Sequence, residues 1–291
     1  MTCEDELVYQ GITEHIQSIS QRGAMKDSIP QSIDPVGAAF YERIGDLYDQ
    51  FTGMDDYDRW GDLLEHLAGT WKVPGKILLD VARGTGKSSI QWHRRGYTVT
   101  GCDLSQTMLL QAQRKPTADS VTFHVDDMRS LQNFNTGSYD AVTCMDDAVN
   151  HVTDDGDLAR TFAAAARVLR SDGLYIFDVN NLKAYRTWFG VTTTTQTDDS
   201  YFILSGRSGG PDFKSDQVAH AHLTVFTRDC GHWNRRDAVW IQRHYPVDRI
   251  EEAMLSCGLH LMASYGLDAG KLQSPADEEE HNKTIYVARR I

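Results

Sequence analysis

A glycine-rich loop with an acid in front of it is the motif in this chain with the clearest chemistry. Residues 80–86 read Asp-Val-Ala-Arg-Gly-Thr-Gly, after an apolar run and before a helical pattern. Glycines at such a place let the backbone approach a ligand closely, and the start of a helix favours a negative group. Five expected strands each end at or beside an aspartate, which indicates a polar crevice at the strand ends: Asp80, Asp103, Asp127, Asp146 and Asp178.

Two familiar nucleotide loops fit this motif poorly. Gly86-Lys87-Ser88 resembles the end of a phosphate loop for ATP or GTP, but that motif needs a glycine five residues before Gly86, where Val81 stands. An NAD-type loop matches only in its first half, because its third glycine position holds Ser89. NAD also gives no reason for the acid at Asp80.

S-adenosylmethionine is a ligand that could bind all three acids at the ends of the first three strands, Asp80, Asp103 and Asp127. This ligand carries an ammonium and a sulfonium but no phosphate, so Asp80 is suited to its amino-acid end, directly or through water. Asp103 lies 23 residues later, at the end of the next strand, and a carboxylate there can accept both ribose hydroxyls. Asp127 ends the third strand and can accept from the adenine amine, while Met128 offers a backbone N–H and a soft side chain.

The elements around these motifs alternate between strand and helix. Hydrophobic periodicity predicts a helical region over 40–71 that is broken at Gly53, and further helices over 87–95, 105–115, 159–169 and 246–258. Short apolar runs predict strands over 76–82, 97–103, 121–127, 139–146 and 174–179, and then antiparallel strands over 201–207, 218–229 and 232–245. Closing strands are expected over 259–266 and 284–290. The expected class is α/β: a Rossmann-like, doubly wound, mostly parallel sheet with an antiparallel β insertion after the fifth strand.

Four segments of the chain together resemble the core of the class I S-adenosylmethionine-dependent methyltransferases. They read LLDVARGTGKSSIQWHRRGYTVTGCDLSQTMLLQAQRK, VDDMRSL, YDAVTCMDDAVNH and VLRSDGLYIFDVN. The resemblance covers roughly residues 38 to 291. It implies an extension at 1–36, a cofactor-binding core at 37–184, an antiparallel lid at 185–245 and the rest of the core sheet at 246–291.

The resemblance also implies which residues hold the cofactor. The glycine loop would take the methionine part, Asp103 the ribose, and the Asp127-Met128 pair the adenine. Met145 follows the fourth strand and suits either the methionine end of the cofactor or ordinary packing. The implied cofactor-binding set is Tyr48, Asp80, Ala82, Gly84, Gly86, Asp103, Leu104, Met108, Asp127, Met128 and Met145.

One position departs from the family pattern. Similar loops usually have Cys or Gly where this chain has Arg83. A long cation beside a sulfonium is unfavourable, so we expect Arg83 to point to solvent or to pair with the cofactor's carboxylate.

The family resemblance predicts methyl transfer to an N or O atom of a small-molecule acceptor. The insertion is similar to the lid of enzymes that methylate natural-product or sugar-like acceptors, so secondary metabolism such as antibiotic biosynthesis is the expected setting. Alternatives are a cofactor-binding protein with little transferase activity, which Arg83 favours, and an NAD-type dehydrogenase.

Candidate acceptor-side residues follow the fourth and fifth strands. His151 could act as a general base for an acceptor hydroxyl. The alternative is a histidine that forms a hydrogen bond with the backbone near a helix start. Asp146 and Asp147 could hold an amine or merely cap a turn. Aromatic side chains that would line the acceptor pocket, or anchor the lid, are Tyr185, Trp188 and Phe189.

Composition narrows the partners further. The 291 residues carry 29 Lys plus Arg against 41 Asp plus Glu, a net charge of −12, which disfavours nucleic acid and anionic membranes. No apolar run approaches the roughly 18 residues of a membrane helix, and the N-terminus does not resemble a signal peptide. Five scattered cysteines indicate a reduced, cytoplasmic protein. We expect a monomer or a homodimer. We expect no metal, because a trio of Asp146, Asp178 and Asn181 is better explained as turn residues.

Overall fold

The computed structural model describes residues 38–53, 57–116, 120–268 and 270–291. All of them belong to one unit, Asp34–Ile291. The expected extension at 1–36 lies outside the described residues.

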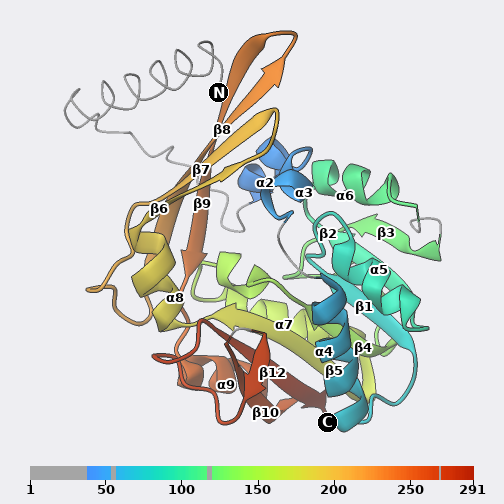
Figure 1. The fold of residues 1–291 in the computed structure, drawn as a ribbon. Coiled ribbons are helices and arrows are strands. Elements are labelled where there is room, and N and C mark those ends of the chain that lie inside the picture. The colour runs from blue at the N-terminus through green and yellow to red at the C-terminus, as the bar shows by residue number, and fades with distance from the viewer. Residues whose placement is uncertain (1–37, 54–56, 117–119, 269) are drawn as a thin grey trace. The chain divides into compact units, whose positions relative to one another are not determined.

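The unit is built on an eight-stranded mixed sheet (Figure 1). Its strands are β1 (Ile77–Val81), β2 (Thr98–Asp103), β3 (Thr122–Val125), β4 (Tyr139–Cys144), β5 (Leu169–Asn180), β10 (Leu259–Asp268), β11 (Lys271–Gln273) and β12 (Lys283–Arg290). Their order is β11-β10-β12-β5-β4-β1-β2-β3. Strands β1 to β5 are parallel to their neighbours, whereas β12 runs antiparallel to β5. Because β1 lies between β2 and β4, the strand order reverses beside the end of β1, where ligands bind in such sheets.

Helices cover both faces of this sheet. The described helices of the unit are α2 (Ala38–Ile44), α3 (Tyr48–Phe51), α4 (Tyr57–Thr70), α5 (Lys87–Arg94), α6 (Gln106–Gln113), α7 (Asp157–Val168), α8 (Leu182–Thr187) and α9 (Val247–Ser256), with short 3₁₀ turns η2 (Ala148–His151) and η3 (Trp188–Gly190). Of these, α2 and α8 pack against the second sheet. Successive residues of a strand face opposite sides, so β1 serves two cores. Leu79 packs in a cluster with Phe162 of α7, and Leu78 packs in another with Leu67 of α4 and Trp92 of α5.

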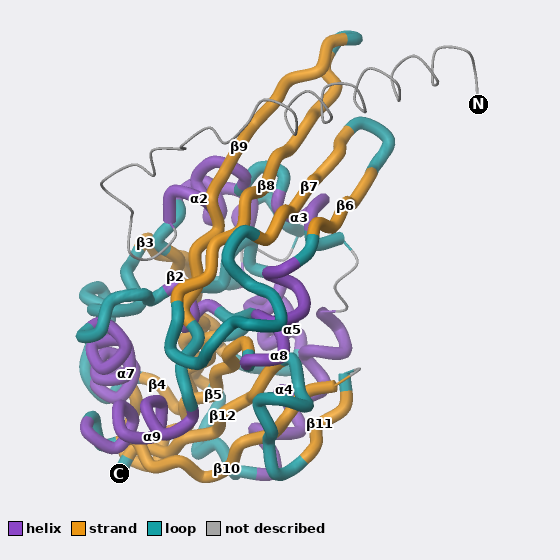
Figure 2. Tube along the Cα trace, turned by 90° about the vertical axis from the view of Figure 1, so that its left-hand side faces the viewer, coloured by secondary structure: helices purple, strands orange, loops and turns teal. Residues whose placement is uncertain are grey.

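A second sheet of four antiparallel strands follows α8. It consists of β6 (Thr192–Gln196), β7 (Ser200–Gly206), β8 (Val218–Asp229) and β9 (His232–Arg243), in that order. Figure 2 shows β8 and β9 as one long hairpin. Cys230 and Gly231 at its tip have φ values of 47° and 81°, as a tight two-residue hairpin turn requires. The inner face packs on α2, where Phe40 and Ile44 join Phe202 and Leu223.

The fold class expected from the sequence is confirmed, and most strand boundaries lie within two residues of those expected. The exception is β5, which begins at Leu169, five residues before the expected strand. The sequence patterns missed α8, β6 and β11. The helical region before Gly53 is two short helices, because the chain turns at Gly45–Leu47. A Cβ on Gly45 would lie 2.8 Å from Cγ2 of Thr107, so this turn lets α2 approach α6 closely. Within the described ranges, no helix is long and apolar enough to cross a membrane.

Candidate functional site

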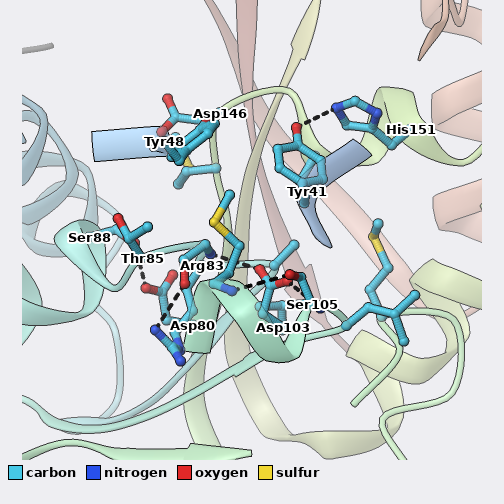
Figure 3. Close-up of a pocket in the computed structure, with 18 of the residues that line it drawn as sticks. Tyr41, Tyr48, Asp80, Arg83, Thr85, Ser88, Asp103, Ser105, Asp146 and His151 are labelled. Atoms are coloured by element: carbon cyan, nitrogen blue, oxygen red, sulfur yellow. Dashed lines mark hydrogen bonds between the residues drawn. The ribbon is translucent and has the colours of Figure 1, made fainter. Parts of the chain in front are cut away.

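A pocket opens at the carboxyl ends of β1, β2 and β4 (Figure 3). Its empty volume is about 870 Å³, a figure that includes space open to solvent. The lining combines glycine-loop residues, strand-end aspartates and side chains of the N-terminal helices. The residues are Ala38, Tyr41, Tyr48, Tyr57, Asp80, Val81, Ala82, Arg83, Gly84, Thr85, Lys87, Ser88, Asp103, Leu104, Ser105, Met108, Asp126, Asp127, Met128, Met145, Asp146, Ala148 and His151.

The glycine loop between β1 and α5 has an unusual backbone. Ala82, Gly84 and Gly86 have φ values of 51°, 57° and 80°, in the left-handed region. Glycine adopts this region at no steric cost, whereas Ala82 is strained there. Gly86 is the N-cap of α5, so the loop delivers the chain directly into the helix start beside the pocket.

Asp80 is held in a single orientation by hydroxyl groups. Ser88 and Ser89 each donate to Oδ2 at 2.6 Å, and Thr143 of β4 donates to Oδ1 at 2.8 Å. The dashed line in Figure 3 joins Ser88 to this carboxylate. Burial raises the pKa of Asp80, while the three hydroxyl donors oppose that shift. A carboxylate has about four lone-pair sites, so Asp80 keeps one for a ligand or water.

Asp103 faces the loop from the end of β2. The backbone N–H of Gly84 donates to Oδ2 at 2.7 Å, and that of Ser105 donates to Oδ1 at 2.9 Å. Each oxygen therefore accepts one bond from the backbone and retains a lone pair. This arrangement orients the carboxylate as a two-oxygen acceptor at the pocket wall.

The acids after β3 are engaged differently from what the sequence suggests. Both oxygens of Asp127 accept from the Arg129 guanidinium, at 3.0 Å from Nε to each and 2.6 Å from Nη2 to Oδ2. Although burial opposes it, these bonds lower the pKa of Asp127. Asp126, which also lines the pocket, accepts from the backbone N–H of Asn133 at 2.8 Å. Arg129 thus uses hydrogen-bonding sites on both oxygens of Asp127, the carboxylate that we expected to accept from an adenine amine.

Arg83 does not point to solvent, which corrects one of the two orientations that we expected. It is 6% exposed, and its guanidinium lies 3.8 Å from the centre of the Phe123 ring. Space for it comes from Gly101 of β2, where a Cβ would lie 2.1 Å from the Arg83 Cδ. Burial lowers the Arg83 pKa to about 10.

His151 lies at the pocket wall within a set of bonds that fix its tautomer. Nδ1 is 2.9 Å from the carbonyl oxygen of Ile241, which only accepts, so Nδ1 carries the proton. Nε2 then accepts from the Trp240 indole N–H at 3.0 Å and from the Tyr41 hydroxyl at 2.8 Å (Figure 3). Burial lowers the pKa of His151 and raises that of Tyr41. The pair is therefore a neutral imidazole with a protonated phenol donating to it.

The two consecutive aspartates after β4 have different surroundings. Asp146 lines the pocket and accepts from the Tyr57 hydroxyl at 2.9 Å. Asp147 is not among the lining residues, because its carboxylate turns toward Lys283 at 2.5 Å and the Gln242 amide. Lys283 also bonds Asp178 at 2.8 Å.

A metal trio of Asp146, Asp178 and Asn181 finds no support among these contacts. The Asp178 carboxylate forms an ion pair with Lys283, and the Asn181 amide donates to a backbone carbonyl at 3.1 Å. In the part of the chain that the structure describes, no three His, Cys, Asp or Glu side chains are grouped to hold a metal.

The aromatic residues after β5 lie away from the pocket. Tyr185 is fully buried and stacks on Phe213, with ring centres 5.0 Å apart. Phe189 packs in the same cluster, and Trp188 is 48% exposed. None of the three is among the residues that line this pocket. Tyr185 and Phe189 instead pack α8 and η3 against the antiparallel sheet, which agrees with the alternative role of an apolar anchor for the insertion.

Comparison of the chain with known proteins shows the family to which it belongs. Residues 78–173 match the model of a methyltransferase domain. The chain is 32% identical over 224 residues to the putative methyltransferase YqeM of Bacillus subtilis, covering 76% of this chain and 87% of that protein. The chain belongs to the S-adenosylmethionine-dependent methyltransferases.

This methyltransferase is also similar to a second relative and to a solved structure. A glycine/sarcosine N-methyltransferase of Aphanothece halophytica is 34% identical over 194 residues, covering 59% of this chain and 73% of that protein. A structure of an S-adenosylmethionine-dependent methyltransferase from Clostridium acetobutylicum superposes with a TM-score of 0.72 at 22% identity, covering 86% of this chain and 98% of that one. The second comparison supports the fold alone.

The pocket of this methyltransferase fits its cofactor chemically. Asp103 presents two oriented oxygens, which match the two ribose hydroxyls, and the loop backbone leaves the pocket open beside the start of α5. Leu104, Met108 and Met128 supply apolar wall near these oxygens, and Met145 lies at the pocket as well.

Several lining residues were missed by sequence reasoning. Tyr41 and Tyr57 come from helical patterns whose apolar faces had been assigned to the core. Thr85, Lys87 and Ser88 stand in the glycine loop and at the helix start, where the motif itself specifies glycines and not these side chains. The Tyr-rich N-terminal helices were the available signal, because tyrosine combines an apolar ring with a hydroxyl that needs a partner.

Proposed function

We propose that this methyltransferase transfers the methyl group to an amine nitrogen of a small-molecule acceptor. When bound, the cofactor supplies a methyl carbon on a sulfonium, which an aligned nucleophile displaces. An alcohol must lose its proton around that step, whereas an amine needs only to arrive neutral. The state of the nearest base therefore bears on the acceptor type.

The hydrogen bonds of His151 carry this proposal. Its Nε2 lone pair already accepts from Tyr41 and from the Trp240 indole, which can only donate. A proton arriving on Nε2 would set two N–H donors against each other at 3.0 Å. The imidazolium is thus disfavoured, and His151 is a poor final acceptor for a hydroxyl proton. It serves better as the acceptor that holds the Tyr41 O–H, which leaves the lone pairs of the Tyr41 oxygen for other donors.

Asp146 supports an amine acceptor from the opposite wall. Its carboxylate lines the pocket and is oriented by the Tyr57 hydroxyl at 2.9 Å. A carboxylate only accepts hydrogen bonds, so it can orient an amine N–H and stabilise the ammonium product. The relative from Aphanothece halophytica, named as a glycine/sarcosine N-methyltransferase, is consistent with nitrogen as the target.

Transfer to a hydroxyl is the second candidate, and Tyr41 is the observation that favours it. The Tyr41 oxygen lines the pocket and donates to His151 at 2.8 Å. A hydroxyl acceptor bonded to this oxygen would have a two-step proton path to Nε2.

Matched acceptors distinguish the two candidates. The full chain would be assayed with labelled S-adenosylmethionine and pairs that differ only in the nucleophile, such as glycine against glycolate and an amino sugar against its hydroxyl parent. We expect label to transfer to amines, with the methylated nitrogen located by mass spectrometry. Transfer confined to the hydroxyl members would refute the amine proposal.

A further inference from the structure

Two cationic side chains line the pocket, and only one is placed to meet an anionic ligand group. The Arg83 guanidinium is buried against Phe123 and donates to the Gly84 carbonyl. Lys87, at the first position of α5, has its side chain 19% exposed. Its ammonium is therefore the accessible positive charge among the lining residues.

The acid nearest to Lys87 is committed to other partners. Asp49 of α3 accepts from the Thr85 hydroxyl at 2.5 Å and pairs with Lys115 at 2.7 Å, but it lies 3.4 Å from the Lys87 ammonium. Two lysines thus share one carboxylate. Although burial opposes the shift, the bonds from Lys115 and Thr85 lower the pKa of Asp49. Asp49 by itself therefore cannot neutralise both ammonium groups.

The surroundings of Lys87 hold its side chain at the pocket wall. The ammonium donates to the Thr52 hydroxyl at 3.0 Å and to the Thr52 carbonyl at 3.3 Å, and it lies 4.9 Å from the centre of the Tyr57 ring. It also stands in the first turn of an eight-residue helix, where unpaired N–H groups add partial positive charge. Of the cofactor's ionic groups, only the carboxylate is negative, so it is the group that this end of the pocket attracts.

We propose that Lys87 binds the carboxylate of the cofactor's methionine part, and that Asp49 and Lys115 are positioning residues that keep the N-terminal helix α3 against the loop. The Lys115 ammonium donates to the Thr85 carbonyl at 2.6 Å, and Asp49 accepts from the Thr85 hydroxyl. The two residues therefore fix both the backbone and the side chain of Thr85 in the loop. The inference rests on the cofactor site and is independent of the proposed choice of amine or hydroxyl.

Calorimetric titration of the full chain with two ligands tests this assignment. S-adenosylhomocysteine carries the carboxylate, and its decarboxylated analogue S-adenosyl-3-thiopropylamine lacks it. Lys87→Met should weaken binding of S-adenosylhomocysteine by about tenfold to a hundredfold, the range for a bond to a charged group, and should leave the analogue within about threefold. Lys271→Met, on the exposed strand β11, is the matched control and should change neither.

The remaining outcomes overturn the proposal. An equal loss for both ligands would mean that Lys87 acts only by holding α3 and α4 in place. No loss for either would remove Lys87 from the site. Lys87→Arg should recover part of the difference between the two ligands, which a purely structural lysine would not do. None of these measurements uses an acceptor, so they leave the amine proposal to its own test.

Discussion

The indole N–H of Trp240 lies 3.0 Å from Nε2 of His151, while the carbonyl of Ile241 lies 2.9 Å from Nδ1. Neighbouring residues of strand β9 therefore bond both nitrogens of the imidazole. One offers only a donor and the other only an acceptor, so the neutral Nδ1–H tautomer satisfies both and the imidazolium satisfies only one. The second sheet thus favours the neutral form of the histidine at the pocket wall.

This relationship predicts how acid affects stability. Burial lowers the pKa of His151 below its ordinary value of 6.5, so the unfolded chain binds the proton more readily than the folded one. Stability from this residue is complete above about pH 6.5 and falls as the pH drops from there toward the folded pKa. The free energy of unfolding, measured in urea between pH 7.5 and 5.5, should fall more in the native chain than in His151→Gln. His260→Gln, on an exposed position of β10, should retain the native slope.

Kinetics should separate the two roles open to His151. If the acceptor is an amine, His151→Ala should lower kcat by less than about tenfold, because no strong base is needed. A general base would contribute about 10²–10⁴-fold, and its loss would show as a fall of that order with unchanged cofactor affinity. Such a fall on a confirmed amine acceptor would contradict the orienting role that we assign to His151.

Sequence reasoning located the cofactor side of the site better than the acceptor side, for a physical reason. Asp80 and Asp103 follow short apolar runs, and the ends of parallel strands meet at one edge of the sheet whatever the loops do. His151, by contrast, is oriented by Trp240, which lies 89 residues away and arrives on a strand of the second sheet. No local pattern reports that pairing. The same holds for Asp147, whose partner Lys283 is 136 residues away.

Asp103 should dominate the affinity for the cofactor's ribose. Removing a two-oxygen, charge-assisted contact should cost about 2–3 kcal/mol, so Asp103→Ala should weaken binding of S-adenosylhomocysteine by about 30- to 150-fold in calorimetry. Asp237→Ala removes a carboxylate that is paired with Arg235 at the exposed surface of β9, and it should leave the affinity unchanged. If Asp103→Ala binds as tightly as the native chain, the two oriented oxygens are not ribose ligands.

Lys283 should matter for stability. It is the cation shared by Asp147 at 2.5 Å and Asp178 at 2.8 Å, in a buried network after β4 and β5. Burial raises the Asp178 pKa to about 6 despite this pairing. Lys283→Met would leave two buried carboxylates without their cation and should lower the free energy of unfolding by about 3–5 kcal/mol. The double variant Lys283→Met with Asp178→Asn should recover part of the loss; if it does not, the charge pairing is not its cause.

Arg83 should be replaceable by an apolar side chain of similar length. Within the described residues its Nε and Nη2 atoms are buried without a hydrogen-bond partner, and each such group costs about 1–3 kcal/mol. Methionine is unbranched and fits the channel that Gly101 leaves open over Phe123. Arg83→Met should therefore raise the free energy of unfolding by about 1 kcal/mol, with attraction to Asp103 and Asp80 offsetting the rest of the gain. Arg83→Ala leaves that channel empty and should be less stable than Arg83→Met by about 2 kcal/mol or more.

Because the guanidinium is packed beneath the loop, the affinity of Arg83→Met for S-adenosylhomocysteine should stay within about threefold of the native value. A loss of affinity beyond tenfold in Arg83→Met, with its stability retained, would instead mean that the buried charge supports the Asp103 carboxylate in holding the cofactor.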